Sequence, residues 1–193
     1  MYIRKLFKNL PKKYQLHKFN NLSLDSRKCK QDDIFFSIRG IKENGNKFIS
    51  NAIKNGARTI VSDLNFQGKK KNILYIKNNN VRKLVSEIAS KLYKEIPKNL
   101  IAITGTNGKS SIASFYFQIL KNKKLNVAAI GTLGIKTNNT NKLTDNTTLD
   151  PITIHKTLSL IKKNKITNTI LEASSHGLKQ YRLDGLRFDI SIF

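Results

Sequence analysis

A glycine-rich segment near the middle of the chain has the composition of a phosphate-binding loop. It reads Gly105-Thr106-Asn107-Gly108-Lys109-Ser110 and lies between an apolar stretch and a run of helix-forming residues. Glycines let the backbone turn tightly enough for its N–H groups to point at phosphate oxygens, and a following helix N-terminus favours negative charge. We expect Lys109 to reach the β- and γ-phosphates of ATP and Ser110 to offer its hydroxyl to Mg²⁺.

The spacing of this loop is shorter than in the general phosphate-loop motif. That motif has a further glycine five residues before Gly108, where this chain has Ile103. The remaining pattern is therefore Gly-x-x-Gly-Lys-Ser. A simple glycine turn beside a chance lysine is the alternative, and the strand and helix expected around the loop argue against it.

An acidic residue and a histidine follow a later apolar stretch. Glu172 comes directly after Thr169-Ile170-Leu171, and Ser174-Ser175-His176-Gly177 follow it. A carboxylate at the end of a strand can hold Mg²⁺ opposite Ser110, although a solvated glutamate is the alternative. His176 has the chemistry to bind phosphate, a metal or a carboxylate, and a structural histidine that caps the turn is equally compatible with the pattern.

Two further polar clusters are turn signals when taken alone. They are Asn146-Thr147-Thr148, which precedes Asp150-Pro151, and Asp25-Ser26-Arg27. Asn, Asp and Ser favour turns because their side chains bond to nearby backbone groups.

The elements that would position these residues suggest two α/β parts. In the first part, strands are expected at 33–38, 59–61 and 73–76, with helices at 48–53 and 81–96. Pro97 then breaks the pattern, so we place the boundary between residues 1–97 and 98–193. In the second part, strands are expected at 100–103, 127–130, 169–171 and 188–193, with helices after the glycine loop and at 152–163. Strands that alternate with helices predict an α/β fold with a mostly parallel sheet, whose ligands bind at the carboxyl ends of the strands.

Composition narrows the class of protein. The net charge is +24, but the lysines are spread along the chain, and the basic run Lys69-Lys70-Lys71 has no interleaved aromatic residues of the kind that stack on bases. We therefore expect no nucleic-acid partner, and a basic nucleic-acid-binding module remains an alternative that explains the charge alone. No apolar run reaches the roughly 18–20 residues that span a bilayer. The single cysteine, Cys29, cannot form an internal disulfide. We expect a cytoplasmic protein without a membrane partner.

Several segments together resemble the Mur ligase family, and the resemblance extends over almost the whole chain. In the first part they are Leu24-Asp25-Ser26-Arg27, Asp33-Ile34-Phe35-Phe36, Gly40, Gly45 with Phe48, Ala52-Ile53 and Gly56-Ala57. In the second part they are Thr104 to Ser111, Gly131-Thr132-Leu133-Gly134, Asn146-Thr147-Thr148, Glu172 to Leu178, Gln180 and Arg182. Serines stand at Ser110 and Ser111 where the family has threonines, which keeps the metal-binding hydroxyl.

The resemblance implies a fold and an activity. The first part would be a small α/β domain that binds the uridine nucleotide, and the second an incomplete ATP-binding domain. Within the family, the segments are most similar to the ligases that add the third peptide residue to UDP-N-acetylmuramoyl-L-alanyl-D-glutamate. The implied partners are this UDP-N-acetylmuramoyl-dipeptide and a free amino acid, expected to be meso-diaminopimelate, with L-lysine as the alternative. A monomer is expected.

The resemblance also implies roles for individual residues. Leu24, Ser26 and Ile41-Lys42-Glu43 would contact the uridine-nucleotide sugar, although the last segment differs from the family's residues. The muramoyl-dipeptide end would be held by Asn146, Thr147, Thr148, Ser174, Gln180 and Arg182. ATP would be bound by Gly105, Thr106, Asn107, Gly108, Lys109, Ser110 and Ser111, with Ser110 and Glu172 on Mg²⁺. Lys109, Glu172 and His176 would be the catalytic residues.

The family also has features for which this chain offers no matching segment. These are a carbamylated lysine, a downstream metal-binding histidine, the rest of the ATP-binding sheet and an amino-acid-binding domain. We therefore expect the 193-residue chain to be a fragment that cannot complete ligation alone. A relative of folylpolyglutamate synthetase is a second alternative. It would explain the ATP loop but not Leu24-Asp25-Ser26-Arg27.

Overall fold

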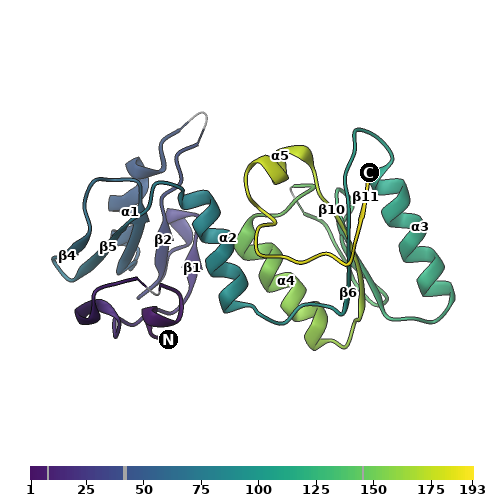
Figure 1. Ribbon diagram of the computed structural model, residues 1–193, viewed down its shortest axis with the longest axis horizontal. Helices are drawn as coiled ribbons and strands as arrows, with labels where there is room; N and C mark the ends of the chain where they lie inside the picture. The colour runs from purple at the N-terminus through teal and green to yellow at the C-terminus, as the bar shows by residue number, and fades with distance from the viewer. Residues whose placement is uncertain (8, 41–42, 145) are drawn as a thin grey trace. The chain divides into compact units, whose positions relative to one another are not determined.

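The computed structural model describes residues 1–7, 9–40, 43–144 and 146–193. The chain divides into two compact units, Met1–Lys91 and Leu92–Phe193 (Figure 1). The sequence placed the division somewhat later, after Pro97. Residues 92–97 lie with the second unit in the structure, where Ile96 packs against its core.

The first unit is built on a five-stranded sheet with the order β1-β2-β3-β5-β4. Strands β1 (Leu22–Ser23), β2 (Ile34–Phe36), β3 (Thr59–Ser62) and β5 (Ile73–Lys77) are parallel, and β4 (Gly68–Lys70) is antiparallel to β5. The α-helices are α1 (Ile49–Lys54) and α2 (Val81–Leu92). Short 3₁₀ helices cover Ile3–Lys5, Lys12–Tyr14, Ser26–Lys28 and Gly45–Phe48.

The second unit contains a six-stranded sheet with the order β11-β6-β10-β7-β8-β9. Strands β6 (Asn99–Ile103), β7 (Val127–Gly131), β10 (Asn168–Glu172) and β11 (Ile190–Ile192) are parallel. Strands β8 (Gly134–Thr137) and β9 (Asn141–Lys142) continue the sheet in antiparallel pairs. The helices are α3 (Lys109–Asn122), α4 (Pro151–Lys163) and α5 (Ser175–Lys179).

Alternate residues of the central strands pack into two separate hydrophobic cores, one on each face of the sheet. Ile101 and Ile170 pack with Ala113 of α3 on one face, while Leu100 and Leu171 belong to the cluster on the other face. Figure 1 shows α3 and α4 on opposite sides of this sheet. Because both faces are covered, the central strands are apolar almost throughout, as the sequence indicated.

The fold confirms the predicted α/β class and corrects some of its details. The helix expected at 81–96 ends at Leu92. Strands β1, β4, β8 and β9 were not predicted; β9, for example, is exposed and polar, so it carries no apolar signal. Among the described residues, no helix has both the length and the apolar character needed to cross a bilayer.

Candidate active site

Three neighbouring strands of the second unit end at one edge of the sheet. In the parallel register, Glu172 at the end of β10 is paired with Ile103 at the end of β6, and Leu171 is paired with Ile130 of β7. The glycine loop follows β6, and Gly131-Thr132 stand at the end of β7. The sheet therefore places Glu172 between the two segments, at the edge where ligands of such sheets bind.

The Glu172 carboxylate is buried and held by three donors. Glu172 is only 2% exposed to solvent. Oε2 accepts hydrogen bonds from the hydroxyls of Ser110 and Thr132, both at 3.0 Å, and Oε1 accepts one from the Thr132 N–H at 3.2 Å. The described part of the chain contains two ion pairs, and neither involves Glu172. A buried carboxylate needs such donors because its charge loses the solvation of water.

Gly131 leaves room for this carboxylate. A Cβ atom built at Gly131 would overlap the Glu172 side chain, with its carboxylate oxygen as the nearest atom. The sequence pointed to Gly131-Thr132 only as part of the resemblance and assigned neither residue to the site. A glycine at the end of an otherwise apolar strand was the available signal, since glycine often marks a close approach of another group.

The glycine loop has the backbone shape that its sequence predicted. Gly105 and Gly108 have φ angles of 130° and 81°, a region that favours glycine. Gly108 is the N-cap of α3, so the loop runs directly into the helix N-terminus. The Lys109 ammonium is folded onto the loop, where it donates to the carbonyl oxygens of Gly105 at 2.7 Å and Thr106 at 3.1 Å. Thr106, Asn107 and Ser111 are exposed.

Thr148 joins a second group of predicted residues to Glu172. Its hydroxyl lies 3.1 Å from the Glu172 carbonyl oxygen and 3.0 Å from the Ser174 hydroxyl, and it accepts from the Ser174 N–H at 2.9 Å. Ser174 in turn caps α5 by accepting from the Gly177 N–H at 3.1 Å. Next to Thr148, the Thr147 hydroxyl lies 3.0 Å from that of Thr132.

Arg182 connects the chain after α5 to the same group. Its guanidinium donates to the Gln180 side-chain oxygen at 2.9 and 3.1 Å and also to the Thr148 carbonyl oxygen. Gln180 Nε2 lies 2.6 Å from His176 Nε2. His176 is exposed and contacts Gln180 rather than Glu172 or the glycine loop. Asn146 is exposed, and its carbonyl oxygen accepts from the Thr144 hydroxyl.

The predicted residues of the first unit lie after β1 and β2. Ser26 is buried, its hydroxyl accepts from Asn51 at 3.0 Å, and its carbonyl oxygen accepts from Asn55 at 2.9 Å. Beside it, Asp25 forms a 2.8 Å ion pair with Arg27, and this hydrogen-bonded guanidinium holds the pKa of Asp25 below its ordinary value. Leu24 is half-buried and Glu43 is exposed. Ile41 and Lys42 lie outside the described residues.

The oxygen atoms of Glu172 and Ser110 are suitable ligands for a Mg²⁺ ion that binds together with a nucleotide. Within the described ranges, no three Asp, Glu, His or Cys side chains gather into a metal-binding group. Mg²⁺ is usually held by one or two carboxylates together with substrate phosphates and waters. Glu172 and the Ser110 hydroxyl, 3.0 Å apart beside the glycine loop, match that smaller requirement.

Comparison with known proteins gives family matches for both units. The model of the Mur ligase middle domain matches residues 103–193, and that of the Mur ligase family, catalytic domain, matches residues 18–102. The chain is 38% identical to a UDP-N-acetylmuramoyl-L-alanyl-D-glutamate–2,6-diaminopimelate ligase of Rickettsia montanensis, over 96% of this chain and 39% of the relative. It is 39% identical to the protein of the same name from Buchnera aphidicola subsp. Schizaphis graminum, over 96% of this chain and 38% of the relative.

Solved structures of Mur ligases also match the chain. A structure of a UDP-N-acetylmuramoyl-L-alanyl-D-glutamate–2,6-diaminopimelate ligase matches with a TM-score of 0.83 and 28% identity, over 99% of this chain and 39% of that one. The fold is also shared with the MurF ligase of Thermotoga maritima in complex with ADP, at a TM-score of 0.58 and 19% identity. The chain thus spans about 39% of the length of the relatives that it matches.

Proposed function

Because this chain belongs to the Mur ligase family, we propose that it forms the uridine-nucleotide-binding and ATP-binding parts of an amide-forming ligase. The proposed reaction adds an amino acid to UDP-N-acetylmuramoyl-L-alanyl-D-glutamate, with ATP as the energy source. The observation that carries the proposal is the contact of Ser110 and Thr132 with buried Glu172, directly beside the glycine loop.

The second unit, Leu92–Phe193, is the proposed site of ATP. The backbone N–H groups of residues 105–111 and the N-terminus of α3 would receive the phosphates. Lys109 would exchange its bonds with the carbonyl oxygens of Gly105 and Thr106 for phosphate oxygens, which are stronger acceptors for an ammonium. Ser110 and Glu172 would hold Mg²⁺. When bound, this ion would neutralise negative charge on the phosphates.

The chemistry that these residues support is the transfer of a phosphoryl group to a carboxylate. The terminal carboxylate of the substrate attacks the γ-phosphorus of ATP, and the bond between this phosphorus and the β,γ-bridging oxygen breaks. ADP departs as the leaving group, and the substrate becomes an acyl phosphate. An amine then attacks the acyl carbon and displaces inorganic phosphate. Lys109 contributes by neutralising the charge that develops on the transferred group, which is the main form of catalysis in such transfers.

The substrate end is assigned to the polar network around Thr148. Thr148, Ser174, Gln180 and Arg182 are connected by hydrogen bonds, so they can present polar groups in fixed positions. Thr147 stands beside this network, with its hydroxyl against that of Thr132. Asn146 would add an exposed side chain at the start of this network. His176 would act through Gln180, which it contacts.

The first unit, Met1–Lys91, is the proposed site of the uridine nucleotide. Leu24, Ser26 and Glu43 lie in segments that follow the carboxyl ends of β1 and β2. The bonds from Asn51 and Asn55 fix the backbone at Ser26, which favours a preformed loop there. The segment at Ile41-Lys42 is part of the same proposal.

The amino acid is proposed to be 2,6-diaminopimelate, in its meso form. The names of the relatives from Rickettsia montanensis and Buchnera aphidicola support this choice over L-lysine. A monomer in the cytoplasm is the simplest state for an enzyme with small soluble substrates.

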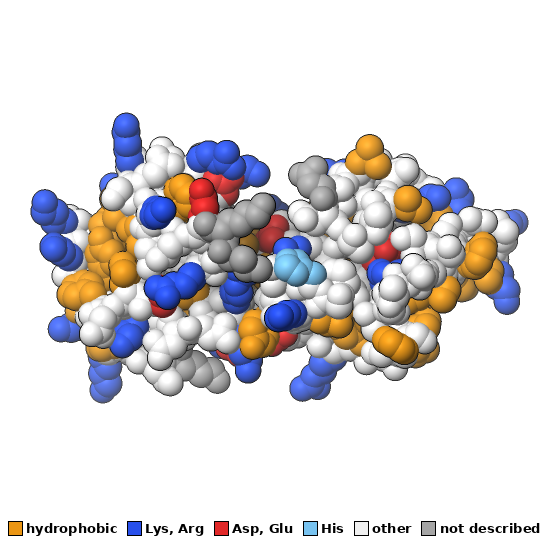
Figure 2. Space-filling view, turned by 90° about the horizontal axis from the view of Figure 1, so that it is seen from above, with side chains coloured by type: hydrophobic (Ala, Val, Ile, Leu, Met, Phe, Trp, Pro, Cys, Tyr) orange, Lys and Arg blue, Asp and Glu red, His pale blue; other side chains and the backbone are white. Residues whose placement is uncertain are grey.

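Nucleic-acid binding has less support. On the face drawn in Figure 2, lysines and arginines are spread over the surface rather than gathered on one element. A protein that grips duplex nucleic acid needs a continuous basic surface along the phosphate backbone.

Calorimetric titration of the chain with UDP-N-acetylmuramoyl-L-alanyl-D-glutamate tests the proposal. We expect saturable binding at a single site, which UDP competes for and which changes little between about 50 and 200 mM salt. Random-sequence duplex DNA should bind weakly, with a steep loss of affinity over the same salt range. Tight binding of the duplex without binding of the UDP-sugar would overturn the proposed function.

A further inference from the structure

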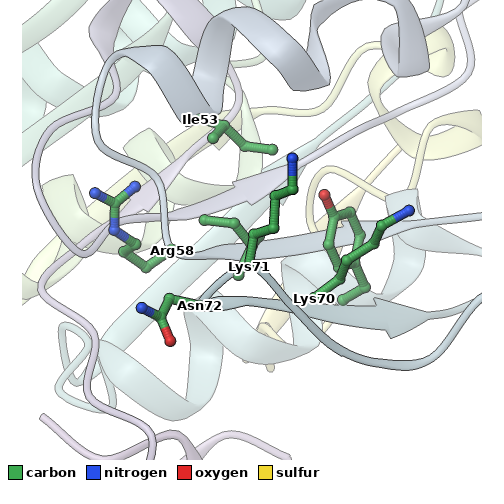
Figure 3. Close-up of a pocket in the computed structure, with 7 residues that line it drawn as sticks. Ile53, Arg58, Lys70, Lys71 and Asn72 are labelled. Atoms are coloured by element: carbon green, nitrogen blue, oxygen red, sulfur yellow. The ribbon is translucent and has the colours of Figure 1, made fainter.

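A basic cavity lies in the first unit, away from the predicted nucleotide residues. It has a volume of about 410 Å³ and is lined by Ile53, Arg58, Lys70, Lys71, Asn72, Ile73 and Tyr75 (Figure 3). That volume is within the range of roughly 300–1,000 Å³ found for small-molecule sites. The lining combines three cationic side chains with an apolar part.

The cavity is at the opposite edge of the sheet from Leu24 and Ser26. Strands β1, β2, β3 and β5 are parallel, so their carboxyl ends share one edge, and the segment at Leu24–Ser26 follows the end of β1. Arg58 directly precedes β3, and Asn72 directly precedes β5. The cavity therefore lies at the amino ends of these strands.

The cations at the cavity lack acidic partners. Within the described ranges, the ion pairs are Arg27–Asp25 and Arg39–Asp63, so Arg58, Lys70 and Lys71 are not neutralised by a carboxylate. The Arg58 guanidinium has a single long contact of 3.5 Å with the Ala57 carbonyl oxygen. In Figure 3 the Lys71 side chain lies between those of Arg58 and Lys70 and extends toward Ile53. An anion in the cavity would meet several unpaired donors.

The backbone fixes the base of Lys71. Lys70 pairs with Ile73, and the two residues between them, Lys71 and Asn72, have φ angles of 46° and 63°. This is the geometry of a two-residue hairpin turn, in which glycine, asparagine or aspartate is usual at both positions. A lysine at the first position costs some conformational energy, and residues held in such conformations often occur at binding sites.

The apolar part of the lining provides a surface for an organic group. Ile73 is 5% exposed, and Ile53 and Tyr75 are half-buried. The Tyr75 ring is held by an edge contact with Phe66, with 5.5 Å between the ring centroids. A planar ring can pack against such side chains while its charged group faces the cations.

We propose that this cavity binds a small phosphate monoester whose organic part is an apolar ring. A dianionic phosphate matches the three unpaired cations better than a monoanionic carboxylate does, and Arg58 offers a planar guanidinium suited to phosphate oxygens. The ring occupies the surface formed by Ile53, Ile73 and Tyr75. This site is independent of the proposed ligase function, because it uses none of the residues assigned to the uridine nucleotide or ATP.

The test is an NMR titration of the full chain with phenyl phosphate, followed through the amide signals of Asn72 and Ile73. Inorganic phosphate, benzoate and phenol serve as probes for the phosphate alone, a monoanionic ring and a neutral ring. We expect saturable shifts with phenyl phosphate and affinities at least about fivefold lower for the other three. Equal shifts with phenol or inorganic phosphate, or shifts that do not saturate, would overturn the proposal.

A matched pair of variants separates this site from the general charge of the protein. Lys71→Asn removes the ammonium and suits the positive φ angle, so it should fold at least as well as the original chain. Lys124→Asn removes the same charge at another exposed lysine with a φ angle of 58°, in the second unit. We expect Lys71→Asn to weaken phenyl phosphate binding about five- to tenfold and Lys124→Asn to leave it unchanged. Equal affinities for the two variants would contradict the site. Unchanged amide signals of β3 and β5 would show that the first unit is folded in both variants, and unchanged amide signals of β7 would show the same for the second unit.

Discussion

The Ser110 hydroxyl donates to the Glu172 carboxylate at 3.0 Å, although the two residues are 62 positions apart in the chain. One stands in the first turn of α3 and the other at the end of β10, and the parallel pairing of β10 with β6 brings them together. This contact joins a hydroxyl next to the glycine loop to a buried carboxylate, and such a pair holds the nucleotide-bound Mg²⁺ in phosphate-loop enzymes.

Replacement of Ser110 should separate the role of its hydroxyl from that of its size. We expect Ser110→Ala to lower the affinity for ATP about tenfold in the presence of Mg²⁺ and to have little effect when the ion is chelated. Ser110→Thr keeps the hydroxyl and should bind ATP nearly as well as the original chain. Titration of a fluorescent ATP analogue with and without Mg²⁺ measures both. An equal loss in the two conditions would show that Ser110 does not act through the metal.

Gly131 should tolerate no side chain. In Gly131→Ala the new methyl group would overlap the Glu172 carboxylate, so that either Glu172 or the end of β7 must move. Overpacking of this kind costs roughly 1–3 kcal/mol of the free energy of unfolding. We expect that loss in urea unfolding, together with weaker binding of ATP and Mg²⁺. Leu133→Ala, at a side chain that is 61% exposed, is the matched control and should change neither quantity. A Gly131→Ala variant with full stability and full ATP affinity would refute the close approach.

Replacement of Arg182 should weaken binding of the UDP-sugar substrate without changing the affinity for ATP. The Arg182 guanidinium holds both Gln180 and the Thr148 carbonyl oxygen, and a lysine lacks the planar fork that makes these bonds together. We expect Arg182→Lys to weaken binding of UDP-N-acetylmuramoyl-L-alanyl-D-glutamate about fivefold and to leave the affinity for ATP unchanged. Arg187→Lys, at an exposed arginine nearby in the sequence, provides the comparison. The assignment fails if both variants bind the UDP-sugar equally well.

The stability of the second unit should fall in mild acid because of His155. This residue of α4 is fully buried, its Nε2 lies 3.2 Å from the Asp184 carbonyl oxygen, and its Nδ1 has no hydrogen-bond partner. Burial lowers the pKa of His155 below its ordinary value of 6.5. The unfolded chain therefore binds a proton at a higher pH than the folded chain does, so stability is full above about pH 6.5 and declines as the pH falls below it.

Urea unfolding at pH 7 and pH 5, followed through the NMR signal of Ile170, measures this decline. His155→Gln retains a donor for the Asp184 carbonyl oxygen and removes the titrating group, so it should reduce the difference between the two pH values. His17→Gln is the control, because His17 lies in the first unit and its pKa is also lowered by burial. A decline at Ile170 that is the same with and without His155 would assign the effect to other groups.

The sequence predicted the α/β fold because the buried strands and amphipathic helices have clear apolar patterns. It placed the glycine loop between β6 and α3 for the same reason, and it expected Glu172 at the same edge of the sheet. It did not assign Gly131 or Thr132 to the site, since their roles depend on the pairing of β7 with β10, which is a non-local contact. Nor did it indicate that His176 would contact Gln180, because that contact depends on the short helix α5.

The basic cavity also could not be predicted from the sequence. Lys69-Lys70-Lys71 was visible as a run of charge, but the antiparallel strand β4 was not predicted. Without that hairpin, nothing brings Lys70 and Lys71 near Arg58, which precedes a different strand. Short edge strands with polar residues have weak patterns, and tertiary contacts decide where they lie.

We propose that the glycine loop binds ATP through Lys109 as part of a ligase. Isothermal titration of the full chain with ATP and Mg²⁺ tests it most directly, in parallel with the variants Lys109→Gln and Lys121→Gln. Both variants remove one positive charge from α3, but Lys121 lies in its last turn. We expect one saturable site, a loss of affinity of at least about tenfold in Lys109→Gln, and no change in Lys121→Gln. Absence of ATP binding, or equal binding by the two variants, would contradict it.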